Sequence, residues 1–181
     1  MRPSNASEYF QELNNVAVTG EQERVANRVK ELIRELNPAH LQPGNTSAAL
    51  ANGDLILKMV HDENSAVYVK AVVDGDGRVD LLCPALHPTF GLRFNDRWDP
   101  DDSLGDEEDA LETLSALIVG RVKSQLTWSG DVIGASKDIL IREDGTPVTL
   151  YRQYHGLGGL AGVLCRGRRE VRRVSFVSES A

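Results

Sequence analysis

A long amphipathic helix followed by a group of short strands occurs twice along this chain, and this order constrains the fold more than any other feature. The spacing of apolar residues predicts the first helix at residues 19–36 and its strands at 54–83. It predicts the second helix at 106–126, with further strands at 138–154 and 170–177. Since such elements pack in layers, we expect an α+β fold of antiparallel sheet or sheets, with both long helices packed on one face.

Both predicted helices carry recognisable end signals and one apolar side. Thr19 is the expected N-cap of the first helix, and Gln22 stands three residues later, as a capping box requires. The apolar stripe of this helix is formed by Val25, Val29, Leu32, Ile33 and Leu36. The second helix begins with an acidic turn, which the helix dipole favours, and its apolar positions are Leu111, Leu114, Leu117 or Ile118, Val122 and Leu126.

The strands of the first half predict an antiparallel meander. It comprises residues 55–60, 66–73 and 78–83, and an Asp-Gly turn of the kind found in tight hairpins precedes the third strand. Residues 47–50 are expected to form one turn of helix, and 90–94 a short strand. A hairpin and a final strand are expected in the second half.

The length of 181 residues predicts one domain over 1–181, with two similar halves, 1–83 and 104–177, joined by a loop at 84–103. The net charge of -7 disfavours binding to nucleic acid and to anionic membranes. No apolar run is long enough to span a bilayer, and the N-terminal residues do not resemble a secretory signal. We therefore expect a cytoplasmic protein.

The cysteines and histidines form no recognisable motif. Cys83 and Cys165 each end an apolar run, and in a cytoplasmic chain both are expected to be reduced and buried. The histidines are His40, His61, His87 and His155, and none has a partner at ligand spacing. No metal or cofactor is therefore predicted. No serine, cysteine or carboxylate pair stands in a catalytic motif either.

The segment 155–162 is rich in glycine and follows a strand, as a phosphate-binding loop would. Gly156, Gly158 and Gly159 would approach the phosphate, with Arg166 and Arg168 as its cationic partners. The dinucleotide fingerprint also requires a following helix and an acidic residue about 20 positions on, which this chain lacks. The alternative is a closely packed connection between two strands.

Arginines cluster near the C-terminal end, where the basic residues are Arg166, Arg168, Arg169, Arg172 and Arg173. Such a cluster can hold phosphate, nucleic acid or an acidic protein surface. On a strand, alternation would place Arg172 on one face and Arg173 on the other. The alternative is an edge strand that its charges protect from aggregation.

Trp98 lies in a polar, proline-containing loop, and Phe90 precedes the same loop. Tryptophan and arginine often anchor protein interfaces, so Trp98, Phe90 and the arginines are the predicted partner-binding residues. The alternative is that Trp98 holds the loop against the core. The acidic residues between 99 and 109 match no EF-hand spacing and suit a solvated loop that leads into a helix.

Taken together, these features favour a non-enzymatic protein-binding domain, such as a small acidic chaperone, an immunity-type inhibitor or an accessory subunit. The alternative is a small-molecule or nucleotide phosphate-binding domain that uses residues 155–162 and the C-terminal arginines. The order of helices and strands resembles the small acidic secretion-chaperone-like and peptide-binding chaperone folds. This resemblance is one of topology, and it implies a protein partner without assigning site residues. A homodimer is compatible with it.

Overall fold

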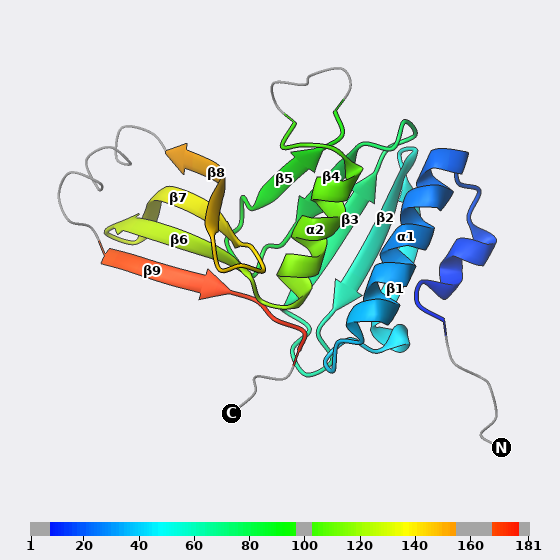
Figure 1. Ribbon diagram of the computed structural model, residues 1–181, viewed down its shortest axis with the longest axis horizontal. Helices are drawn as coiled ribbons and strands as arrows, with labels where there is room; N and C mark the ends of the chain where they lie inside the picture. Colours follow the sequence, from blue (N-terminus) through cyan, green and yellow to red (C-terminus); the bar gives the residue numbers. More distant parts are fainter. Residues whose placement is uncertain (1–7, 97–102, 155–167, 178–181) are drawn as a thin grey trace.

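The computed structural model describes residues 8–96, 103–154 and 168–177, which form two antiparallel sheets and two α-helices (Figure 1). The helical elements are η1 (Gln11–Asn15), α1 (Gly20–Leu36), η2 (Pro43–Asn45) and α2 (Glu107–Ile118). Sheet A contains β1 (Thr46–Ala51), β2 (Asp54–Val60), β3 (Tyr68–Val73), β4 (Val79–Leu82) and β5 (Gly91–Phe94) in that order. Sheet B has the order β8-β7-β6-β9, with β6 (Val122–Ser129), β7 (Val132–Ile141), β8 (Pro147–Tyr154) and β9 (Arg168–Arg173).

The first helix begins where the sequence predicts. The side chains of Thr19 and Gln22 form the expected capping box, and α1 runs to Leu36. The Gln22 side chain is buried, and its Nε2 also donates hydrogen bonds to the carbonyl oxygens of Gly53 and Val73, at 2.8 and 3.0 Å. The same residue therefore caps the helix and fixes its N-terminal end against sheet A.

The second helix is shorter than predicted, because α2 ends at Ile118. Gly120 follows with a φ of 78°, a left-handed conformation that glycine commonly adopts just after a helix. Beyond this turn the chain forms β6. Val122 and Leu126 are buried as expected, but on one face of a strand, since positions four apart share a face in a strand as well as in a helix.

The predicted fold class, with two long helices over one face of antiparallel strands, is wrong. α2 has 12 residues, and the strands belong to two sheets that together contain more of the described residues than the helices do. The predicted meander is confirmed as β2, β3 and β4 of sheet A. Residues 47–50 are part of β1 rather than a turn of helix, because β1 pairs with β2 along its whole length. The similarity of the two halves stays a prediction.

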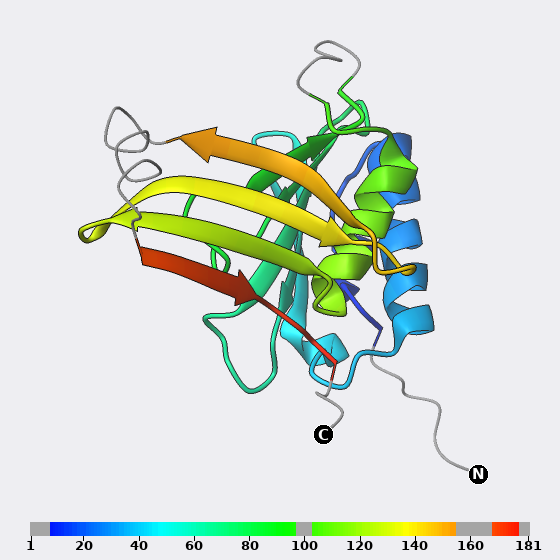
Figure 2. The same cartoon turned by 60° about the vertical axis from the view of Figure 1, so that its left-hand side comes forward.

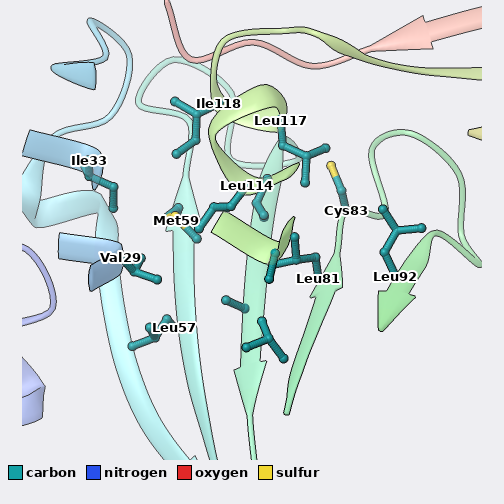
Figure 3. Packing of buried hydrophobic residues seen from close by; sticks show 14 of the residues in the cluster. Val29, Ile33, Leu57, Met59, Leu81, Cys83, Leu92, Leu114, Leu117 and Ile118 are labelled. Atoms are coloured by element: carbon teal, nitrogen blue, oxygen red, sulfur yellow. The ribbon is translucent and has the colours of Figure 1, made fainter. Parts of the chain in front are cut away.

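The main core lies between sheet A and its two helices (Figure 3). α1 contributes Val29 and Ile33, and α2 contributes Leu114, Leu117 and Ile118. Their partners on the sheet are Leu57, Met59, Leu81, Cys83 and Leu92, all almost fully buried. Every second residue of β2, β3 and β4 is buried, as expected for strands with one covered face.

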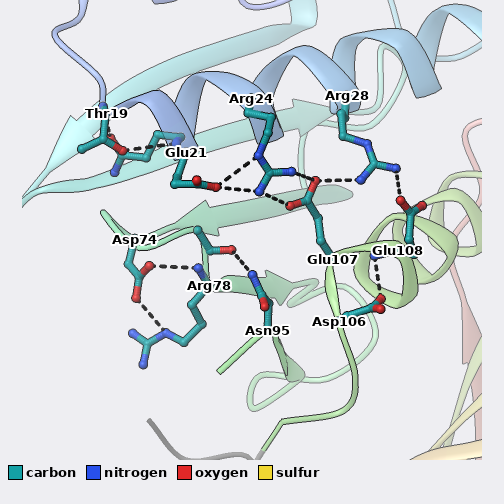
Figure 4. A network of polar contacts seen from close by, with 12 residues as sticks. Thr19, Glu21, Arg24, Arg28, Asp74, Arg78, Asn95, Asp106, Glu107 and Glu108 are labelled. Carbon is teal, nitrogen blue, oxygen red and sulfur yellow. Dashed lines mark hydrogen bonds and ion pairs between the residues drawn. The ribbon is translucent and has the colours of Figure 1, made fainter. Parts of the chain in front are cut away.

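The two helices are also joined by ion pairs at their solvent side (Figure 4). Glu107, in the first turn of α2, pairs with Arg24 at 2.6 Å and with Arg28 at 2.8 Å, both from α1. Arg28 also pairs with Glu108 at 2.5 Å. The pKa of Arg24 is raised above its usual value, mainly by the hydrogen bond that it donates to Glu107 and secondly by the one that it donates to Glu21. The network fixes the N-terminal end of α2 over α1.

Sheet B extends from the C-terminal end of α2, and in Figure 2 its four strands lie in front of sheet A. Val122, Leu140, Val174 and Phe176 belong to the same buried cluster as the core of sheet A. The segment after β9 returns to α2, where the N–H of Phe176 donates to the carbonyl oxygen of Ile118 at 2.7 Å. Within the described part of the chain, neither helix is both long and apolar enough to cross a bilayer.

Cys83 is fully buried, unpaired with another cysteine, and burial raises the pKa of its thiol to about 12. Because the thiolate is the reactive form, we expect iodoacetamide at mildly alkaline pH to leave Cys83 unmodified in the folded protein. Peptide mapping by mass spectrometry should show its alkylation only after denaturant is added. A cysteine introduced by Ser129→Cys at the exposed end of β6 serves as the reactive control. Equal labelling of Cys83 and of this cysteine in the folded protein would contradict the burial of Cys83.

Candidate functional site

Strand β9 sends its arginines to opposite faces of sheet B, as alternation predicts. Arg168 and Arg172 share a face with Trp128, and their guanidinium carbons lie 5.0 and 6.0 Å from the centre of its ring. Glu170 lies between them in sequence, and it accepts hydrogen bonds from Trp128 Nε1 at 2.9 Å and Arg172 Nε at 2.6 Å. The bond from Arg172 lowers the pKa of the Glu170 carboxyl.

These contacts give Arg168 and Arg172 a structural role on the inner face of sheet B. Arg172 Nη1 also donates to the carbonyl oxygen of Leu86 at 3.5 Å, and so reaches the segment that leads into β5. Trp128 is only partly buried and packs beneath the two guanidinium groups. Both arginines already have partners within the fold.

The outer face of sheet B presents the remaining cations of this region. The pairing register places its residues in three rows that cross the sheet. The rows are Tyr154, Ala135, Thr127 and Arg169; then Arg152, Lys137, Gln125 and Val171; and then Thr149, Ile139, Lys123 and Arg173. We call these residues the basic face. It carries five cationic side chains, and none of its residues is acidic.

A groove of about 390 Å³ runs over the basic face. Its lining includes Lys137, Arg152, Tyr154 and Arg169, and also Glu170, which belongs to the opposite face of β9. Neighbouring strands lie roughly 4.8 Å apart and successive residues on one face roughly 6.6 Å apart, so each cation lies within reach of a ligand that contacts its neighbours. Small or neutral side chains, such as Ala135 and Thr127, form the floor between the longer ones.

Exposed apolar groups gather on the same sheet. Among the described residues, the large hydrophobic side chains that remain exposed are Leu50, Val132, Tyr151, Tyr154 and Val171, and all except Leu50 belong to sheet B. Val171 is 59% exposed and Tyr154 is 48% exposed, and both lie in the groove. Tyrosine and arginine, both present on this surface, are enriched at protein interfaces.

The other residues predicted from the sequence fall elsewhere. Phe90 is buried and packs edge-on against His87, with ring centres 5.5 Å apart, so it is not available to a partner. Trp98 lies outside the described residues. The same is true of the residues proposed to bind phosphate between β8 and β9, namely Gly156, Gly158, Gly159 and Arg166, and of His155 and Cys165.

A buried polar network joins sheet B to the segment before β5. His87 Nε2 lies 3.2 Å from Asp138 Oδ1, and Ser124 Oγ donates to the same carboxylate at 2.5 Å. His87 Nδ1 lies 3.1 Å from the hydroxyl oxygen of Thr89. Hydroxyl, imidazole and carboxylate groups in series also occur in catalytic triads. Here His87 and Asp138 are each only 1% exposed, so a substrate cannot reach them and the network is structural.

Sequence reasoning missed the cations that β9 does not supply. The spacing of apolar residues assigns Lys123 to a helix, and the sequence alone gives Lys137 and Arg152 no role. The signal that could have identified them is the hairpin of β7 and β8, in which Lys137 and Arg152 are paired across the two strands and their side chains share one face. No model of a known protein family, no curated protein and no solved structure matches this chain.

Proposed function

We propose that this protein is a non-enzymatic protein-binding domain, and that its basic face binds an acidic segment of a protein partner. The observation that carries the proposal is the set of five cations on one sheet face, in a chain of net charge -7. Chaperones, immunity-type inhibitors and accessory subunits all fall within this function. We place its activity in the cytoplasm.

The size of the basic face favours a short acidic segment over a long polyanion. Four strands span roughly 14 Å from the first to the last, so nucleic acid would continue past the sheet. The groove between α1 and α2 is lined by five glutamates and two arginines, namely Glu31, Glu35, Glu108, Glu112, Glu143, Arg28 and Arg121. Such carboxylates repel phosphates, and they leave sheet B as the favourable contact for negative charge.

The exposed apolar residues also suit a peptide. Tyr154 and Val171 lie at opposite edges of the sheet, on β8 and β9, with Lys137 and Gln125 between them. A partner segment with alternating acidic and apolar residues would neutralise the cations and cover the two apolar groups at the same time. Charge complementarity of this kind mainly increases the association rate and the specificity.

The test is a binding measurement with a defined peptide. We expect a fluorescein-labelled peptide of alternating glutamate and valine, about five residues long and thus just able to cross the face at roughly 3.3 Å per residue, to raise its anisotropy on binding. The double reversal Lys137→Glu with Arg152→Glu should weaken binding by about 100-fold, because like charges then face each other. Added salt should weaken binding to the unchanged protein.

The matched control places the same charge change on the other sheet. Lys58 and Lys70 face each other on the uncovered side of sheet A, over Tyr68. Reversal of both to glutamate should leave peptide binding within about twofold. If both double variants lose peptide affinity equally, the loss reflects the net charge of the protein and not the basic face. If a single-stranded oligonucleotide binds more tightly than the peptide, the partner is nucleic acid and the proposal is wrong. Sedimentation without peptide shows whether a second copy occupies the face.

A further inference from the structure

We propose that His40, His61 and Asp62 form a binding site for a divalent transition-metal ion. His40 Nδ1 lies 3.1 Å from Asp62 Oδ1, and His61 Nδ1 lies 3.5 Å from the same oxygen. One potential ligand atom from each residue lies within 4.8 Å of the others. The site is at one end of sheet A, none of its residues belongs to the basic face, and it does not depend on the proposed protein partner.

Backbone hydrogen bonds hold these residues together although they are distant in sequence. The N–H of Asp62 donates to the carbonyl oxygen of His40 at 3.1 Å, which joins the end of β2 to the connection between α1 and β1. The N–H of His40 donates to the carbonyl oxygen of Phe176 at 2.8 Å. The His61 ring in turn packs on the Phe176 ring, with centres 5.6 Å apart. The fold itself therefore places the three side chains at one point.

The distances between the donors are those of a small coordination sphere. Zinc binds imidazole nitrogen and carboxylate oxygen at about 2.0–2.2 Å, so two donors of a tetrahedral ion lie roughly 3.3–3.5 Å apart. The separations of 3.1 and 3.5 Å are close to this spacing, and the donors of all three residues lie within 4.8 Å of one another. Two imidazoles with one carboxylate select zinc, cobalt, nickel or copper over calcium and magnesium, which prefer oxygen.

A second carboxylate and solvent access complete the site. Glu63 Oε1 lies 3.7 Å from His40 Nδ1, which makes it available as a fourth donor. The side chains of His40, His61 and Asp62 are 24%, 14% and 27% exposed, so an ion can enter while most of the site stays protected. The two carboxylates give this end of the sheet a negative charge, which attracts a cation.

Metal binding has two structural costs. His40 Nδ1 must give up its hydrogen bond with Asp62 Oδ1, at 3.1 Å, to offer a lone pair to the ion. The His40 and His61 rings are stacked, with centres 4.7 Å apart, and His61 Nδ1 accepts the N–H of Glu63 at 3.2 Å. The His61 ring must turn away from this N–H so that the Nδ1 lone pair can bind the ion. The exposed N–H of Glu63 then donates its hydrogen bond to water. We therefore expect a site that binds reversibly rather than one that holds its ion through purification.

The test is a titration of chelator-treated, tag-free protein with Co²⁺, whose visible absorption reports tetrahedral coordination. We expect one Co²⁺ per chain, displacement by Zn²⁺, and a rise of the melting temperature with Zn²⁺, since a ligand that binds only the folded state stabilises it. His40→Gln and Asp62→Asn should each weaken Co²⁺ binding at least tenfold and abolish the Zn²⁺-dependent rise.

The control variant is Asp76→Asn, which changes an exposed carboxylate in the turn between β3 and β4 and should bind as the unchanged protein does. His61→Gln is a weaker test because its ring packs on Phe176, so the other two variants decide the result. Absence of Co²⁺ absorption, or undiminished binding in both His40→Gln and Asp62→Asn, would overturn the proposal. In the second case the ion is bound by other groups.

Discussion

Replacement of Asp138 with alanine is expected to lower the free energy of unfolding by about 3–4 kcal/mol, because it breaks a buried polar pair. The carboxylate accepts the Ser124 hydroxyl at 2.5 Å and lies 3.2 Å from His87 Nε2. Both partners are almost fully buried, so without Asp138 they keep their desolvation cost and lose their hydrogen bonds. Chemical denaturation followed by circular dichroism measures the change.

Two comparisons make this result specific to the network. Asp131→Ala removes an exposed carboxylate from the β6–β7 turn of the same sheet and should change the unfolding free energy by less than about 0.5 kcal/mol. Asp138→Asn keeps an acceptor for Ser124 and should cost less than the alanine variant. A loss below about 1 kcal/mol for Asp138→Ala would mean that water satisfies His87 and Ser124.

Phe176→Ala is expected to cost about 4 kcal/mol, which is typical of a large aromatic residue removed from a core. The ring is 0% exposed and belongs to the cluster shared by both sheets. The backbone bonds of residue 176 to Ile118 and His40 do not involve the side chain, so the loss reports packing alone. Guanidinium unfolding at equilibrium gives the value.

The control for Phe176→Ala is Val132→Ala, a truncation at a side chain that is 67% exposed. It should leave stability nearly unchanged. If Phe176→Ala costs as little as Val132→Ala, the segment after β9 is not part of the cooperative core. If the cost is large and Co²⁺ binding is also lost, the packing of His61 on Phe176 contributes to the arrangement of the metal site.

Local signals were sufficient for the first helix and the meander. The capping box of Thr19 and Gln22 and the buried stripe of α1 were both predictable, because helix ends and helical periodicity depend on nearby residues. The alternation of β2, β3 and β4 was predictable for the same reason. These elements depend on contacts between neighbours in the sequence.

The second helix was overextended because its apolar spacing fits two structures. Val122 and Leu126 would share a face of either a helix or a strand, so their spacing could not distinguish them. Gly120 was the usable signal, since glycine often follows the last turn of a helix. β1 gave no such signal: its alanines favour a helix, and pairing with β2 overrides that preference.

The candidate site was predictable only in part. Alternation correctly separated Arg172 from Arg173, because it requires β9 alone. The association of Arg169 with Lys137 and Arg152 depends on the register of four strands. The approach of His40 to His61 depends on the pairing of β1 with β2, which brings the end of β2 back to the connection before β1. Both are non-local relations that residue spacing does not encode.

The strand order of sheet B also determines how it forms during translation. β6 pairs on one side with β7, the next strand to be made, and on the other with β9, which follows only after β8 and residues 155–167. A nascent chain therefore carries β6 with an open edge for much of the synthesis of this region. When several ribosomes translate one messenger RNA, neighbouring nascent chains are close together. The β9 strand of one chain can then pair with the open edge of β6 in the next chain, so exchange of β9 is the misassembly that this topology favours.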